Sequence, residues 1–204
     1  VILLVFRDTI LGFVTGIHVS TSKNLKIGDW IGIPKYNIEG NIQDINLLTT
    51  KIVNFDKTIS TIPTYDLLST EIRNHQVMYE GSSRRIKRSI YFNIKSFKFV
   101  DDEFYEKVKD INLISEYMDR KLREIAESKK NIPHAERIIN GQQLTNIGLF
   151  RNYVLNYLKN NPKVDQDEIV LVRQLEISPQ GMPLEIYCFA NKAELVDYER
   201  IQAD

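Results

Sequence analysis

The sequence predicts an α+β protein in which an apolar helix precedes two small domains of different character. Residues 1–19 are almost continuously apolar, and residues 25–68 form short β-like runs separated by turn residues. Residues 84–204 combine extended runs with helical repeats, and 204 residues provide enough chain for two separate cores. We therefore expect a helix segment over 1–24, a small β domain over 25–70, a linker over 71–83 and a mixed α+β domain over 84–204.

The N-terminal stretch reads VILLVFRDTILGFVTGIHV, and only Arg7 and Asp8 interrupt its apolar character. It is marginal as a complete membrane span, and it lacks the basic leader and cleavage site of a signal peptide. A buried amphipathic helix is the simplest interpretation. Because the apolar pattern starts without a capping residue, we expect this segment to be the end of a longer apolar helix. Gly12 and Gly16 have the spacing that lets helix backbones approach closely, which predicts helix packing there.

Short runs with tight turns predict a strongly bent β domain after this helix. Residues 26–29 form a turn into the strand-like run 30–34, and Gly40 leads into a second run. Ile42 is out of phase with Ile45, which predicts a β-bulge or a sharp bend of the strand between them. Two further runs, 49–55 and 58–62, are followed by Pro63. Four or five such strands in about 45 residues are typical of a small barrel.

The last 120 or so residues predict an α+β domain. Residues 84–100 are mostly extended, and Asp101 stands at the expected N-cap of a helix. Apolar residues at helical spacing follow over 111–125 and again over 150–158, where Asn160-Asn161-Pro162 ends the second pattern. Strands are expected over 169–177 and 184–189, joined by the turn 178–181, and a last helix begins near residue 193. The pattern reaches residue 204 without a stop signal, so we expect the natural chain to continue.

The sequence offers no residues to carry catalysis or to hold a metal or cofactor. Lysine plus arginine equals aspartate plus glutamate at 27 each, which argues against general nucleic-acid binding. The three histidines are far apart and have no metal-ligand spacing, and the single cysteine, Cys188, lies in an apolar strand. The densest basic cluster spans Arg84 to Arg88. It is interpreted either as a solvated strand edge or as a contact for RNA or lipid head groups.

An apolar glycine-spaced helix and five short segments after it, in a fixed order, resemble the mechanosensitive channel of small conductance family. The five segments read GDWI at 28–31, EGNI at 39–42, TTKI at 49–52, NFD at 54–56 and TIP at 61–63. The second domain is similar to the α/β cage domain of that family. Its segments RRIKRSI, QLTNIGLFRNYVLNYL and PLEIYCFAN resemble the miniconductance subgroup.

The resemblance implies an Sm-like β domain below a pore helix, followed by a ferredoxin-like cytoplasmic domain. It implies a tension-gated ion channel subunit that protects the cell from hypoosmotic shock, in a homo-oligomeric ring of seven. Missing N-terminal spans would anchor the ring in the lipid bilayer of the bacterial inner membrane, with this region on the cytoplasmic side. The partners would be permeating ions and other copies of the chain, with no nucleic acid, cofactor or metal.

On the same resemblance, Leu4 and Val5 are candidates for the apolar constriction of the pore, which would exclude water when closed. Gly28, Asp29, Gly40 and Pro63 are expected to have structural roles in the β domain.

Two positions depart from the family pattern. Thr64 stands where the family usually has asparagine, and Arg7-Asp8 occupies the region of the pore-helix kink, where glycine is common. The role of that asparagine is therefore not transferred to Thr64.

Two other functions remain open at this point. An Sm-like RNA-binding module would use the β domain and the basic cluster, and it predicts salt-dependent RNA affinity. A soluble oligomeric scaffold would have no apolar segments encoded ahead of residue 1.

Overall fold

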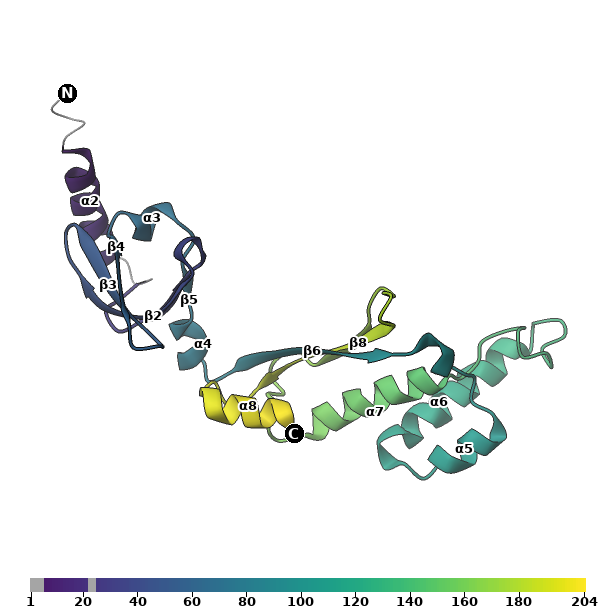
Figure 1. Cartoon of the computed structure of the whole chain (residues 1–204). Helices are drawn as coiled ribbons and strands as arrows, with labels where there is room; N and C mark the ends of the chain where they lie inside the picture. Colours follow the sequence, from purple (N-terminus) through teal and green to yellow (C-terminus); the bar gives the residue numbers. More distant parts are fainter. Residues whose placement is uncertain (1–5, 22–24) are drawn as a thin grey trace. The chain divides into compact units, whose positions relative to one another are not determined.

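A computed structural model describes residues 6–21 and 25–204 of the chain (Figure 1). The chain divides into two compact units, residues 1–81 and residues 82–204. The first unit contains an apolar helix and a small β-sheet, and the second is a mixture of strands and helices. The observed class is the predicted mixed α+β one.

The first unit begins with helix α2 (Arg7–Thr21), and its sheet is antiparallel in the order β4-β3-β2-β1-β5. Its elements are β1 (Trp30–Ile33), η1 (Pro34–Tyr36), β2 (Ile38–Ile45), β3 (Thr49–Asn54), β4 (Ile59–Pro63), α3 (Asp66–Ser69), β5 (Arg73–Asn74) and α4 (Gln76–Glu80). Alternate residues of these strands point to one side, where five isoleucines and Leu67 form the core. The strands are short and the side chains are β-branched, which favours a bent, half-buried sheet.

A β-bulge interrupts the pairing of β2 with β3. Ile42 pairs with Ile52, but Asp44 pairs with Lys51, so the extra residue of β2 lies between Ile42 and Asp44. An additional residue reverses which face the following side chains occupy. The change of phase that predicts a bulge between Ile42 and Ile45 is therefore confirmed.

The segment 71–83, expected as a linker, contains β5 and α4. Ile31 of β1 pairs with Asn74, and the backbone N–H of His75 donates to the carbonyl of Trp30 at 2.8 Å. The side-chain amide of Asn74 also donates to Asp29, at 3.0 Å. Because these contacts are polar and β5 has only two residues, a pattern of hydrophobic residues cannot predict this strand. Residues 73–80 are therefore structured as part of the first unit, and the boundary between the two units falls within the expected linker, after residue 81.

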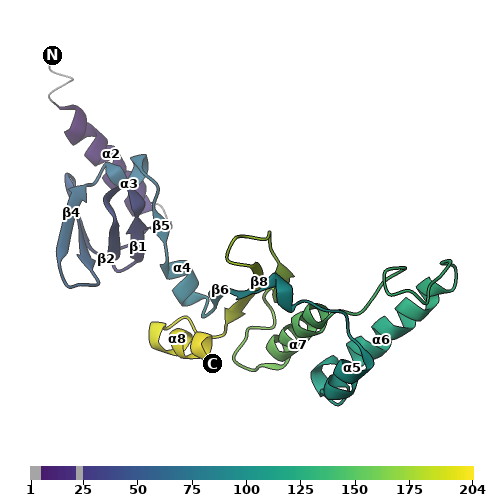
Figure 2. The ribbon, with the colours of Figure 1, turned by 45° about the vertical axis from the view of Figure 1, so that its right-hand side comes forward.

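The second unit has a three-stranded antiparallel sheet in the order β6-β8-β7, with α7 and α8 on one face of it (Figures 1 and 2). Its elements are β6 (Arg84–Phe92), η2 (Ile94–Ser96), α5 (Asp102–Val108), α6 (Asn112–Lys129), α7 (Asn146–Asn160), β7 (Leu171–Gln174), β8 (Met182–Ala190) and α8 (Leu195–Ala203). Val154 of α7 packs on Val172 and Leu184 of the sheet, while Tyr198 of α8 packs on Ile86 and Cys188.

Several expected helix and strand ends are confirmed in this unit. Asp101 accepts a hydrogen bond from the backbone N–H of Phe104 at 2.8 Å and caps α5. Helix α7 ends at Asn160, before Pro162. The extended runs are shorter than expected: β6 ends at Phe92 and β7 has only four residues. After Phe92, the side chain of Asn93 accepts from Lys95 N–H and begins a 3-10 turn instead.

Candidate functional site

Helix α2 exposes an apolar face within the described residues. Because successive residues of an α-helix are about 100° apart, positions 6, 10, 13, 14 and 17 fall within an arc about 100° wide. All five side chains on this arc are about half exposed, at 49–55%: Phe6, Ile10, Phe13, Val14 and Ile17. A continuous apolar stripe of this width is what a helix presents to another helix or to lipid.

The opposite face of α2 packs on the β-sheet unit through small residues. Gly12 is buried, and a Cβ added to it would lie 2.2 Å from the carbonyl oxygen of Leu47 in the β2–β3 loop. Thr15 is 1% exposed, and its hydroxyl donates to the carbonyl of Leu11 at 2.7 Å. The helix therefore approaches the loop so closely that only glycine fits at position 12.

Gly16, four residues later, has a different environment. An added Cβ would meet no atom within 4 Å. Gly12 thus packs against a loop and not against a helix, whereas at Gly16 the space is open. A close approach of a further helix at Gly16 stays a prediction.

The β2–β3 loop that contacts α2 is fixed by Thr64. The hydroxyl of Thr64 donates to the carbonyl of Asn46 at 2.7 Å, and its backbone N–H donates to the carbonyl of Leu48 at 3.0 Å. Its hydroxyl also lies 3.1 Å from the hydroxyl of Thr50, and both side chains are completely buried. Thr64 therefore holds the loop on both sides of the residue that α2 touches.

Sequence reasoning missed Leu47 and the buried threonines. Leu47 contacts Gly12 through its backbone carbonyl, and a backbone contact leaves no trace in residue type. Thr64 was singled out only as a departure from the family pattern. A threonine directly after an Ile-Pro strand end was the one available signal that a small hydrogen-bonding side chain is needed there.

Leu4 and Val5, the candidates for a pore constriction, lie outside the described residues. Helix α2 is described from Arg7 onward, and Ile10 N–H donates to the carbonyl of Phe6 at 2.9 Å. The described helix is therefore regular from its first turn.

The β-domain motif residues occupy turns and close contacts. Gly28 has a φ of +96° in a turn, where its N–H donates to the carbonyl of Ile42 at 2.8 Å. The carboxylate of Asp29 accepts from Lys26 N–H and from Asn74, each at 3.0 Å. Gly40 lies against Val53 of β3, and Pro63 ends β4. These contacts support the expectation that their roles are structural.

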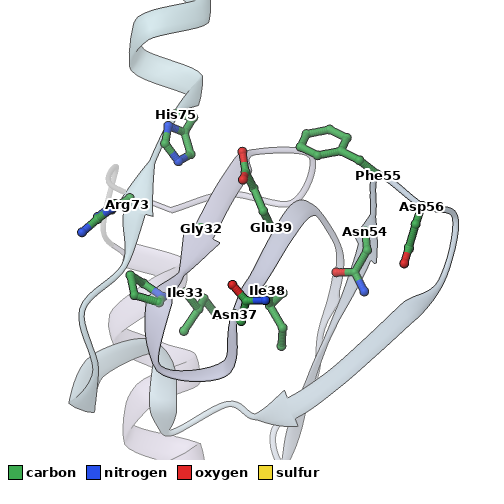
Figure 3. Close-up of a pocket in the computed structure, with 11 residues that line it drawn as sticks. Gly32, Ile33, Asn37, Ile38, Glu39, Asn54, Phe55, Asp56, Arg73 and His75 are labelled. Carbon is green, nitrogen blue, oxygen red and sulfur yellow. The ribbon is translucent and has the colours of Figure 1, made fainter. Parts of the chain in front are cut away.

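A polar pocket of about 560 Å³ opens on the β-sheet unit (Figure 3). Arg73 and His75 come from β5 and the residue after it, opposite Asn54 and Asp56 from the end of β3 and its turn. The ring of His75 lies 4.9 Å from that of Trp30 and covers Gly32, where an added Cβ would be 3.1 Å from its Nε2.

Three charged groups of this pocket have partners within the fold. The carboxylate of Glu39 accepts from the indole N–H of Trp30 at 3.1 Å. Asp56 accepts from the N–H and the hydroxyl of Thr58, which lowers the pKa of its carboxyl. Arg73 donates to Glu71 at 2.9 Å. Glu39, Asp56 and Arg73 are thus held by partners outside the pocket lining, whereas the buried Oδ1 of Asn54 has no hydrogen-bond partner among the described residues.

The basic cluster at Arg84–Arg88 is also engaged within its unit. The guanidinium of Arg84 lies 4.4 Å from the ring centre of Tyr198, and Lys87 lies 3.6 Å from the carboxylate of Glu185. Strand β6 lies at one edge of its sheet, which agrees with the interpretation of the basic cluster as a solvated strand edge. Burial raises the pKa of the Cys188 thiol to about 11, so this cysteine is inert.

Within residues 6–21 and 25–204, no helix is both long and apolar enough to cross a membrane. The same residues contain no group of three or more histidine, cysteine, aspartate or glutamate side chains arranged to hold a metal ion.

The known proteins that this chain is similar to are mechanosensitive channels. The family model "Mechanosensitive ion channel, beta-domain" matches residues 8–77, which include most of α2 and the whole first sheet. The chain is 24% identical over 198 residues to the low conductance mechanosensitive channel YnaI of Escherichia coli, covering 97% of this chain and 43% of YnaI. It is 35% identical over 71 residues to the small-conductance mechanosensitive channel MscMJ of Methanocaldococcus jannaschii, covering 35% of this chain and 20% of MscMJ.

Solved structures of channels have the same fold. MSL1 of Arabidopsis thaliana matches with a TM-score of 0.62 at 17% identity, over 98% of this chain and 54% of that one. The closed state of Helicobacter pylori MscS matches with a TM-score of 0.55 at 15% identity, over 99% of this chain and 61% of that one.

The chain spans less than half the length of the curated relatives that it matches. The two solved structures share the fold of nearly the whole chain, and the β-domain family model covers residues 8–77. Residues 8–77 match the β-domain of mechanosensitive ion channels, and the chain is similar to mechanosensitive channels of the MscS type over nearly its whole length.

Proposed function

We propose that this chain is the end of the pore helix and the cytoplasmic region of a tension-gated ion channel subunit. In this proposal the subunit forms a homo-oligomer, a ring of seven, in the bacterial inner membrane and protects the cell from hypoosmotic shock. Segments outside this chain would anchor it in the lipid bilayer. The chain itself would assemble the ring and filter permeating ions, without catalysis, cofactor or nucleic acid.

One observation carries the proposal: a single channel-family match covers both α2 and the sheet on which it packs. Helix α2 meets the β2–β3 loop at Gly12 and leaves its apolar stripe exposed. A helix placed in this way has one face for its own β-domain and one for its neighbours in a ring. Membrane tension favours the state with the larger in-plane area, so movement of such helices away from the axis would open the pore.

The test is electrical recording from the full-length protein. Patches of membrane that contain it should show stretch-activated currents under suction, whereas patches without it should not. Silence under suction close to the rupture of the patch would contradict the proposal.

A pair of variants connects the current to α2. Phe13→Asn places an amide in the exposed stripe, and we expect it to change the tension at which channels open, because wetting of an apolar contact becomes easier. Val196→Asn is the control, since Val196 is exposed to a similar extent, at 62% against 55% for Phe13, but lies in α8. If Phe13→Asn channels opened at the same membrane tension as wild type, the exposed apolar stripe of α2 would have no role in gating.

A further inference from the structure

The second unit has an apolar groove between its helices. A cavity of about 250 Å³ is open to the surface there. Its floor is formed by Ile114 of α6 and Leu149 of α7, each 3% exposed. Phe104 and Val108 of α5 and Phe150 and Tyr153 of α7 also line it. Cavities for drug-sized ligands are mostly larger than about 300 Å³, so this one suits one or two side chains better.

The amide of Asn146, which also lines the groove, is occupied by the fold. It donates to the carbonyl of Ser96 at 2.8 Å and accepts from the N–H of Lys98 at 3.1 Å. The groove therefore offers apolar contact, and a polar ligand would gain little there.

Two exposed isoleucines lie in the loop that follows the C-terminal end of α6. Ile138 and Ile139 in the loop 130–143 are 61% and 81% exposed, and Ile139 is the most exposed large apolar side chain among the described residues. Hydrogen bonds fix the loop: Gln143 donates to the carbonyl of Ile138, and Asn140 donates to that of His134, both at 2.9 Å. The isoleucine pair is thus held in place, which lowers the entropy lost when it binds.

The pair does not reach the groove of its own chain in this structure. From Ile114 to the end of α6 at Lys129 the helix rises about 22 Å, and the loop leaves from that far end. Figures 1 and 2 both show the loop extending beyond the end of α6, away from α5. The isoleucine pair can therefore fill this groove only on another copy of the chain.

The charges around the two features are complementary. Residues 101–110, which include α5 at the rim of the groove, contain five acidic and two basic side chains. The loop 130–143 contains Lys130 and Arg137 against one acid, Glu136. Arg137 directly precedes the isoleucine pair, so docking of the loop would bring a net positive segment to a net negative rim.

We propose that Ile138 and Ile139 of one copy bind in the groove between α5 and α7 of the next copy. The proposal rests on the homo-oligomer of the proposed function and adds the contact that joins its cytoplasmic units. The contact is heterologous, because two different patches of the same chain meet, and such contacts form a ring when the rotation between neighbouring copies closes.

Cysteine cross-linking of the full-length protein in its membrane tests this contact. Ile139→Cys and Val108→Cys place one thiol on the loop and one in the groove, while native Cys188 is buried and inert. Under mild oxidation, the double variant should form a ladder of cross-linked species. The two single variants, when coexpressed, should form dimers at most, and each alone should stay uncross-linked.

Three results would overturn the inference. Cross-linking of Ile139→Cys alone would show a two-fold contact between loops. An uncross-linked double variant in a protein whose native mass is oligomeric would place the contact elsewhere and leave the channel proposal intact. A monomeric native mass together with absent stretch-activated current would count against the proposed function itself.

A second measurement uses the solubilised oligomer. Ile138→Ser with Ile139→Ser should lower the detergent concentration at which it dissociates, since the apolar contact is lost. Ile177→Ser is the matched control, because Ile177 is 59% exposed in the β7–β8 hairpin of the same unit. Equal dissociation of both variants would also contradict the inference.

Discussion

At Gly12 the backbone of α2 lies against the carbonyl oxygen of Leu47, because glycine has no Cβ to hold the two apart. Gly12→Ala would place a carbon 2.2 Å from that oxygen, so the helix or the loop must move. We expect a loss of about 1–3 kcal/mol in the free energy of unfolding, typical of overpacking. Gly16→Ala meets open space and should gain up to about 1 kcal/mol, because alanine is the better helix former.

Thermal or denaturant unfolding of the two variants beside wild type measures this difference. Opposite signs for Gly12→Ala and Gly16→Ala are the expected outcome. Equal effects would mean that α2 does not rest on the β2–β3 loop in solution.

Thr64 has a related role at the residue scale. Its hydroxyl donates a hydrogen bond to the carbonyl of Asn46, and its backbone N–H donates one to the carbonyl of Leu48. These two residues flank Leu47, which α2 contacts. The departure from asparagine at this position thus keeps a hydrogen-bonding side chain. The hydroxyl is shorter than an amide, which fits a site that is completely buried.

At the scale of elements, β2 and β3 approach closely at Gly40. A Cβ there would lie 2.1 Å from the carbonyl oxygen of Val53 and 2.8 Å from the Cα of Asn54. Both contacts are with backbone, which cannot rotate aside. Gly40→Ala should therefore push the strands apart and cost about 1–3 kcal/mol of unfolding free energy.

Asn41→Ala is the control on the same strand, since Asn41 is exposed and pairs with Val53. Unfolding of both variants in denaturant gives the comparison. A Gly40→Ala protein as stable as the control would show that the strands are further apart than the structure has them.

The side chain of Glu185 interacts with basic side chains of both neighbouring strands in the second sheet. It lies in the central strand and is 3% exposed, and its carboxylate accepts from Arg173 of β7 at 2.8 Å. Lys87 of β6 lies 3.6 Å from its other oxygen. Half-exposed basic side chains cover the acid from both sides, which explains how a charged residue is tolerated in an otherwise apolar strand.

At the scale of the whole molecule, each unit has a buried carboxyl group with a lowered pKa. The hydrogen bond from Arg173, aided by Lys87, lowers the pKa of Glu185. Burial alone would raise the pKa of Asp66, but hydrogen bonds from Tyr36 and Ser69 and the charge of Lys35 outweigh it and lower that pKa. A lowered pKa means that each carboxyl group binds a proton more readily in the unfolded chain than in the folded one. The resulting stabilisation of the fold is complete above the ordinary pKa values, 4.5 for Glu185 and 3.8 for Asp66, and it is lost as the pH falls below them.

We therefore expect both units to lose stability in acid. Thermal unfolding between pH 3 and pH 7 measures this, and Glu185→Gln should reduce the pH dependence of the second unit because it has no titrating carboxyl at this position. A Glu185→Gln protein whose acid dependence equals that of wild type would rule out Glu185 as the group concerned.

Patterns of local origin were predicted correctly from the sequence. The bulge after Ile42, the cap at Asp101 and the end of α7 at Asn160 all depend on neighbouring residues. The strand β5 and the shortened β7 were missed, because their pairing depends on distant partners such as Trp30 and Leu184. The candidate gate residues Leu4 and Val5 stay predictions.

The sequence by itself determined the class of the fold and the order of its longer elements. It also indicated the similarity to mechanosensitive channels, since five short motifs in order after an apolar helix need no contact to be recognised. Only the tertiary structure decided that Gly12 and Gly16 differ, that Thr64 fixes the loop beneath α2, and that Glu185 lies between Arg173 and Lys87. The physical reason is that glycine contacts, buried hydroxyl bonds and ion pairs between strands depend on distances between residues far apart in the chain. Residue type and spacing carry no record of those distances.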